Sequence, residues 1–162
     1  MADLTVNINE SVTLNNQVIE ASHTLTISSV VDIFRRIVSI ASGDDATVLV
    51  FKSTTAIADG ALDKEKVKYL RITNLESSNS VKISLQLDSG EDNSAADLSV
   101  THLLEAGKSF MMGSVDEAVH ANDSSSSIIT ALTDLESIIV DSGSNNVQVE
   151  VFAASISWQF KK

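Results

Sequence analysis

Apolar and polar residues alternate with a period of two along most of this chain, and this pattern constrains its fold more than any other feature. In the segment VKISLQL (residues 81–87), four aliphatic residues occupy the odd positions, and lysine, serine and glutamine occupy the even ones. Successive side chains of a β-strand point to opposite faces, so one face of this segment is apolar and the other is polar. The pattern predicts a half-buried β-strand.

The same alternation predicts β-strands elsewhere in the chain. The clearest segments are 4–8, SVTLNNQVI on either side of Asn15-Asn16, 23–27, 46–51, the runs within 67–87 and within 100–113, LESIIVDSG (135–143, a strand followed by a turn) and 147–160. Residues 30–41, VVDIFRRIVSIA, fit both a strand and one face of a helix. The many β-branched side chains in this segment favour the strand.

Turn residues predict how several strands are joined. Asn15-Asn16 lies between two alternating runs, and asparagine tolerates the left-handed backbone angles of a tight hairpin turn. Residues 67–87 are predicted to form one β-hairpin and residues 100–113 a second one, with Gly107 supplying the positive φ of its turn. In the last run, 147–160, the large apolar residues change from odd to even positions, which predicts a β-bulge or a strand that moves between sheets.

These elements together predict an all-β chain. Nine to eleven short strands follow one another at spacings near ten residues, with long polar loops at 53–66, 88–97 and 114–127. The spacing favours an antiparallel β-sandwich, jelly-roll-like, in a single domain covering residues 1–162. The chain has no proline, which suits paired strands, and only 4% aromatic residues, so the core is expected to be aliphatic.

The acidic balance of the chain limits its partners. The net charge is −11, which disfavours binding to nucleic acid and to anionic membrane surfaces. The charge is interpreted first as a solubilising surface, and second as an acidic face for a basic partner or for cations. The N-terminal residues show no secretory signal, and no apolar run approaches the ~20 residues that span a bilayer, so we expect synthesis in the cytoplasm.

No residue pattern predicts catalysis, a cofactor site or a metal site. The chain has no cysteine, and its histidines, His23, His102 and His120, lack the spacing of metal ligands. No nucleophile-elbow or phosphate-binding glycine motif is present. The sequence therefore predicts a protein that is not an enzyme, with no catalytic, cofactor-binding or metal-binding residues.

Two segments leave alternatives open. The loop 88–97 contains Asp88, Glu91, Asp92 and Asp97, which read as a solvated acidic loop or as a weak site for a hard cation. Trp158 and Phe160 read as a plug at the edge of the core or as residues that dock a neighbouring subunit.

Three segments resemble small virion structural proteins of tailed bacteriophages, of the type found in marine and cyanobacterial phages. They are VKYLRITNLESSNSVKISLQL (67–87), HLLEAGKSFMMG (102–113) and VQVEVFAASIS (147–157). The shared features are a Tyr-Leu-Arg-Ile-Thr-Asn strand, an Ala-Gly turn before a Ser-Phe strand, and a closing Val-Glu-Val-Phe-Ala strand. The resemblance covers residues 65–157 and includes no catalytic signature.

The resemblance implies a non-enzymatic β-sandwich present in many copies on a phage particle. Such a protein acts as a capsid decoration (cement) protein or as a neck or tail component. Its partners would be the major capsid protein or other virion proteins, and it would form a homo-oligomer, for which a trimer is one permitted form. It would reside in the virion after assembly in the host bacterial cytoplasm. A glycan-binding or adhesive module is the alternative, although few aromatic residues are present to stack on sugars.

The two interpretations of residues 88–97 differ in their dependence on metal ions. If this loop is only solvated, removing divalent cations with EDTA leaves the melting temperature of the protein unchanged. Thermal unfolding followed by circular dichroism, with and without the chelator, measures this. A large drop in melting temperature would establish the cation site instead.

Overall fold

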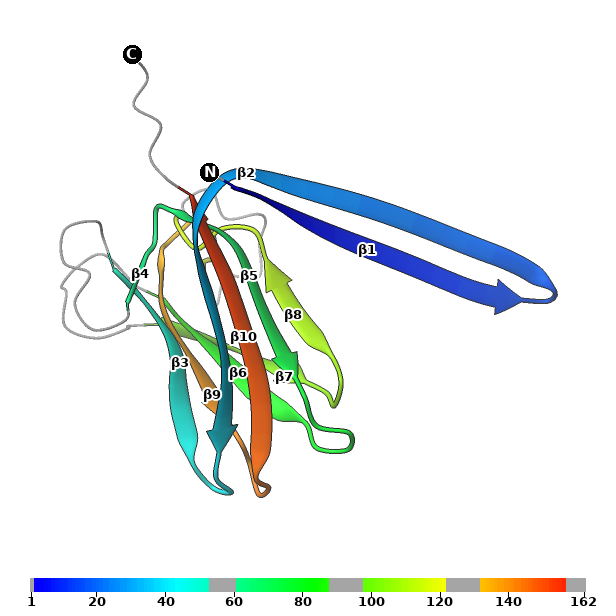
Figure 1. Ribbon diagram of the computed structural model, residues 1–162. Helices are drawn as coiled ribbons and strands as arrows, with labels where there is room; N and C mark the ends of the chain where they lie inside the picture. Colours follow the sequence, from blue (N-terminus) through cyan, green and yellow to red (C-terminus); the bar gives the residue numbers. More distant parts are fainter. Residues whose placement is uncertain (1, 53–60, 88–97, 122–131, 157–162) are drawn as a thin grey trace, which may run out of the picture.

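A computed structural model describes residues 2–52, 61–87, 98–121 and 132–156 of the chain. These residues form ten β-strands (Figure 1). The strands are β1 (Ala2–Leu14), β2 (Gln17–Ile40), β3 (Asp45–Lys52), β4 (Leu62–Asp63), β5 (Val67–Asn74), β6 (Val81–Leu87), β7 (Leu98–Leu104), β8 (Ser109–Met112), β9 (Leu135–Asp141) and β10 (Val147–Ile156).

The strands form two five-stranded sheets with jelly-roll connectivity. One sheet has the order β1-β2-β10-β5-β8 and the other the order β4-β3-β9-β6-β7. Without β1 and β4, each sheet has four antiparallel strands. Consecutive strands of this set lie in opposite sheets, except that β6 and β7 are neighbours in one sheet, and this order is that of a jelly roll. The predicted fold class, an all-β antiparallel sandwich with jelly-roll-like topology, is confirmed.

The core between the sheets is aliphatic, as the composition indicates. Ile72 of β5, Ile83 of β6 and Ile138 of β9 are completely buried in one apolar cluster that both sheets supply. The alternation predicted for residues 81–87 is confirmed, because all four odd-numbered side chains are buried. Phe51 is the aromatic side chain that joins the buried members of this cluster.

The two predicted hairpins are wrong. Strands β5 and β6, which fall in residues 67–87, lie in opposite sheets, and so do β7 and β8 of residues 100–113. Alternation identifies a half-buried strand but does not identify its partner, and in a jelly roll many consecutive strands cross from one sheet to the other. Gly107 does adopt the predicted positive φ, 69°, in the crossing between β7 and β8.

A buried asparagine holds the crossing between β5 and β6. Asn74 is completely buried, and its amide nitrogen donates to the carbonyl oxygens of Asn79 (2.8 Å) and Leu104 (3.1 Å). Its side-chain oxygen accepts a hydrogen bond from the backbone N–H of Glu76 at 3.1 Å. Both the nitrogen and the oxygen of the buried amide therefore have hydrogen-bond partners, as a buried polar group requires.

The N-terminal strands are much longer than expected. The predicted short strands of residues 4–41 are instead one strand of 13 residues, β1, and one of 24 residues, β2. The predicted turn at Asn15-Asn16 is confirmed, with φ values of 51° and 62° that fit a two-residue hairpin turn. The strand preferred for residues 30–41 is also confirmed. The hairpin of β1 with the first part of β2 projects away from the sandwich (Figure 1).

Two register shifts mark the place where β2 leaves the sandwich. The first lies in the pairing with β1, between the partners Val30 and Ile27, and includes Ser29 at a φ of 65°. The second lies in the pairing with β10, between Ser155 and Ile156. An extra residue in one strand bends it and changes which side chains share a face.

The bulge predicted for residues 147–160 is wrong for the described part of this run, because β10 has no inserted residue: the extra residue at the shift beside Ile156 is Val31 of β2 in one ladder and Lys68 of β5 in the other. The large side chains Phe152 and Ile156 occupy even positions because they pack on the outer face of the sheet, beside Val30 and Tyr69. The alternative, a strand that moves between sheets, is wrong for the described part of this run, because β10 stays in one sheet. Residues 157–160 of the same run lie outside the described residues.

The core predicts unequal effects for two leucines. Leu135 is completely buried, whereas Leu103 on β7 is 56% exposed. We expect Leu135→Ala to lower the free energy of unfolding by about 2–5 kcal/mol, because it leaves a cavity. Leu103→Ala, the matched control, should change it by less than about 0.5 kcal/mol. Urea denaturation measures both, and equal losses would contradict this description of the core.

Candidate interaction surfaces

Several of the segments singled out in the sequence are not described by the structure, and the described ones lie apart. Residues 88–97, Trp158 and Phe160 lie outside the described residues. His23 is on β2 opposite Ile8, and the ring of His102 on β7 lies 5.9 Å from that of Phe110. Across the described parts of the chain, no three histidine, aspartate or glutamate side chains are grouped to hold a metal ion. Those parts also include no helix that is long and apolar enough to cross a membrane.

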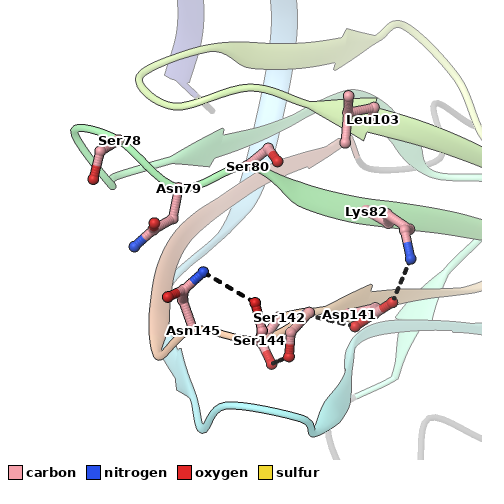
Figure 2. Close-up of a pocket in the computed structure, with 10 residues that line it drawn as sticks. Ser78, Asn79, Ser80, Lys82, Leu103, Asp141, Ser142, Ser144 and Asn145 are labelled. Carbon is pink, nitrogen blue, oxygen red and sulfur yellow. Dashed lines mark hydrogen bonds and ion pairs between the residues drawn. The ribbon is translucent and has the colours of Figure 1, made fainter.

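A polar hollow of about 280 Å³ lies at one end of the sandwich, beside the turn between β9 and β10 (Figure 2). Its charged groups are Lys82 and Asp141, whose Nζ and Oδ2 atoms are 3.2 Å apart. The lining residues are Ser78, Asn79, Ser80, Lys82, Leu103, Asp141, Ser142, Gly143, Ser144 and Asn145. Hydroxyl and amide groups of this kind can bind a small polar ligand through hydrogen bonds.

The carboxylate in this hollow is poorly suited to proton transfer. The backbone N–H of Gly143 donates to Asp141 at 2.7 Å, and this bond, together with Lys82, lowers the pKa of Asp141 below its ordinary value. A general base works best with a pKa near the working pH, so a lowered pKa makes Asp141 a weak proton acceptor at neutral pH. The arrangement is typical of a structural ion pair.

The outer face of the first sheet carries a polar network across four strands. Glu150 of β10 accepts hydrogen bonds from Arg35 of β2 (2.7 Å) and from Arg71 of β5 (2.5 Å). Arg71 also donates to Thr73, whose hydroxyl lies 2.8 Å from that of Ser109 on β8. The Glu150 side chain is only 11% exposed, and two guanidinium groups compensate its charge.

The arm, defined as residues 2–29, is the most unusual surface of the protein. Its two strands are amphipathic with respect to the hairpin plane. On one face, Asn7 accepts a hydrogen bond from Thr24 and Asn9 accepts one from Ser22, each at 2.8 Å. The other face is mostly aliphatic and also carries Glu10, Gln17 and His23. Its aliphatic residues are Leu4, Val6, Ile8, Val12 and Leu14 of β1 and Ile19, Ala21, Leu25 and Ile27 of β2.

Most of this aliphatic face is exposed. Val12, Leu14 and Ile19, near the end of the arm, are 55%, 60% and 57% exposed. Among the described strands, β1 pairs with β2 alone. An isolated two-stranded hairpin is marginally stable in water, so an arm of this length is expected to be completed by another molecule.

The aliphatic face of the arm continues onto the outer face of the sandwich. At the bend, Val30, Tyr69 and Ala154 form a buried cluster, and the partly buried residues packed against it come from both parts: Leu4, Val6, Ile27, Phe152 and Ile156. Tyr69 and Phe152 meet edge to face, with ring centroids 6.0 Å apart. Each of the two bulges of β2 adds one residue and so moves the following side chains to the other face. The second bulge reverses the change made by the first, and the aliphatic face of the arm therefore continues onto the outer face of the sandwich.

Sequence reasoning missed this surface because alternation looks the same in a buried strand and in an exposed one. One signal is present in the sequence. Residues 2–29 contain three acidic residues and no lysine or arginine, whereas the rest of the chain contains both acidic and basic residues.

Comparison with known proteins adds little to these observations. No family model matches the chain, and no curated protein matches it. Among solved structures, the chain is similar to one from the Bacillus endospore appendages, which are described as a novel family of disulfide-linked pili. The identity is 10%, the match covers 77% of this chain and 89% of that chain, and the TM-score is 0.35. A TM-score this low does not establish a common fold.

The Glu150 network predicts a pH dependence of stability. Hydrogen bonds from Arg35 and then Arg71 lower the pKa of Glu150 from its ordinary value of 4.5. A lowered folded-state pKa stabilises the protein above the unfolded value, and this stabilisation is lost as the pH falls through the folded-state pKa. We expect Glu150→Gln to lower the free energy of unfolding by about 2 kcal/mol at pH 7, and by less at pH 3.

Urea denaturation at the two pH values measures this difference. Glu105→Gln, at an exposed position in the turn between β7 and β8, is the control and should have little effect at either pH. The same loss for Glu150→Gln at pH 3 as at pH 7 would show that the charge of Glu150 is not what stabilises the sheet.

Proposed function

We propose that this protein is a non-enzymatic structural subunit of a phage particle, and specifically a capsid decoration protein that stabilises the head through protein–protein contacts. The observation that carries this proposal is the exposed amphipathic arm on a jelly-roll sandwich. Its partners are the major capsid protein or other virion proteins, together with further copies of this chain. In this proposal the protein is assembled in the host bacterial cytoplasm and resides in the virion.

The arm supports an assembly role because it presents a large aliphatic surface to water. Exposed apolar patches of several hundred Å² are rare on monomeric proteins and commonly mark sites of protein–protein contact. The exposed side chains at the end of the arm, Val12, Leu14 and Ile19, lie side by side on one face. An arm of this form can contact a neighbour at a distance from the sandwich.

The sandwich supports the same role as a rigid base for the arm. Its aliphatic core, its satisfied buried amide at Asn74 and the three-strand ion pair at Glu150 all favour one fixed shape. Jelly rolls occur in viral capsid proteins, and this analogy of fold supports the proposal together with the resemblance of residues 65–157 to phage virion proteins. A neck or tail component uses the same features and is the nearest variant of the proposal.

A glycan-binding module is the second candidate, and the polar hollow beside Asp141 favours it. Jelly rolls also occur in lectins, and hydroxyl and amide groups like those of the hollow can bind sugar hydroxyls. None of the ten residues that line the hollow is aromatic, so it offers no ring for sugar stacking. This candidate therefore ranks below the structural role.

The structural role predicts that the protein is a stoichiometric part of phage particles. Particles purified on a density gradient from cultures that produce this chain should contain it at tens to hundreds of copies, as measured by quantitative mass spectrometry. A cryo-EM map of the same particles distinguishes a head position from a neck or tail position. Recovery of the chain only in the soluble fraction would contradict the proposal, and specific binding on a glycan array would favour the second candidate.

A further inference from the structure

We infer that the aliphatic face of the arm docks on the outer face of the sandwich of a second copy of this chain. The contact surface on the second copy, called here the receiver strip, consists of Ile33, Arg35 and Ile37 of β2 and the neighbouring outer residues of β10. This inference deepens the proposed structural role by naming one partner and its surface, and it rests on that role.

The first argument is that the arm is not used by its own sandwich beyond the bend. Leu4, Val6 and Ile27 at the base of the arm pack against the buried cluster of the bend. Farther out, the arm projects clear of the sandwich (Figure 1), and Val12 and Ile19 stay more than half exposed. None of the described residues of its own sandwich therefore covers the free part of the aliphatic face (Figure 1).

The second argument is a match between the order of residues on the two surfaces. On the arm, β1 presents Ile8, Glu10 and Val12 in succession on one face. On the receiver strip, Ile33, Arg35 and Ile37 succeed one another on the outer face of β2, opposite Ala154, Phe152 and Glu150 of β10.

Both series have an aliphatic residue, a charged residue and an aliphatic residue at two-residue intervals, and the charges are opposite. Two strands have the same repeat, about 6.8 Å for every two residues, so face-to-face packing of the arm on the strip aligns all three positions. Glu10 then meets Arg35, while the aliphatic residues on either side pack on one another.

The third argument is the distribution of charge. The arm has Asp3, Glu10 and Glu20 and no basic residue. The receiver strip, by contrast, carries the basic side chain of Arg35, which is 66% exposed although it also pairs with Glu150. Contact between two arms brings only acidic groups together, whereas contact of the arm with the receiver strip places Glu10 beside a basic side chain.

The fourth argument is the extent of the surfaces. The exposed part of the arm, Ile8–Leu14 with its partner residues, is about 24 Å long and about 10 Å wide at the usual strand dimensions. The outer face of the ten-residue β10 and its neighbours is longer and wider than this. Two reciprocal contacts between a pair of copies bury roughly 1,000 Å² in total, which reaches the lower limit for a specific interface.

The exposed apolar residues of the receiver strip fit the same contact. Ile33 and Ile37, on the outer face of β2, are 45% and 55% exposed. Met111 on the outer face of β8 is 45% exposed. A protein that keeps these positions apolar on two surfaces with matching order is suited to bind a copy of itself.

The test uses two neighbouring residues on opposite faces of the arm. Ile19 lies on the aliphatic face at 57% exposure, and Val18 lies on the polar face at 61%. Ile19→Lys and Val18→Lys add the same charge at nearly the same place. Sedimentation velocity on the full-length protein should show an oligomer for the wild type and for Val18→Lys. For Ile19→Lys, the dissociation constant should rise by at least about tenfold, because a buried aliphatic contact is lost.

A receiver variant, Ile33→Ser with Ile37→Ser, should weaken association in the same way. Mixing it with Ile19→Lys should give association stronger than that of either variant alone and weaker than that of the wild type, because one of the two reciprocal contacts then joins an intact arm to an intact strip. Far-UV circular dichroism checks that every variant is folded, which is expected since all four side chains are exposed.

Several outcomes would overturn the inference. A monomeric wild type would do so, as would equal effects of Val18→Lys and Ile19→Lys. Failure of the mixed variants to associate would contradict docking of an arm on a receiver strip. The assay uses purified protein alone, so these failures are separate from failure to find the chain in phage particles.

Discussion

The long hydrogen-bond ladder of β2 is the constraint on which the rest of the structure depends. Its last residues pair with β10 inside the sandwich, and its first residues pair with β1 outside it. One strand therefore belongs both to the packed body and to the projecting arm. Because the same strand carries both ladders, the arm and the sandwich belong to one hydrogen-bonded sheet.

Two bulges turn this continuous sheet into a bent surface. They lie within a few residues of Val30, where the strand passes from β10 to β1 as its main partner. Each bulge adds one residue, and the two together keep the aliphatic face of the arm in line with the outer face of the body. The cluster of Val30, Tyr69 and Ala154 packs at this bend with residues from both the arm and the body. The proposed assembly role depends on the exposed aliphatic face that begins there.

The body and the arm use the same side-chain pattern for opposite purposes. In the body, the alternation of residues 81–87 buries aliphatic residues against a second sheet. In the arm, the alternation of β1 leaves aliphatic residues exposed, because neither described sheet lies over them (Figure 1). Polar groups also act differently in the two parts. Glu150 joins three strands of the body through two arginines, whereas Asn7 and Asn9 join only the two strands of the arm.

Strand character in most segments, the aliphatic core and the turn at Asn15-Asn16 could be predicted from the sequence, because period-two alternation and the left-handed tolerance of asparagine are local properties. The lengths of β1 and β2, and β4 inside the expected loop 53–66, could not be predicted. The sequence did not determine which strands pair, and it therefore misplaced β5 and β6 in one hairpin. Nor did it reveal the candidate surface, since an exposed aliphatic face and a buried one have the same pattern in the sequence. Strand partners and exposure are decided only in the tertiary structure, by contacts between residues far apart in the chain.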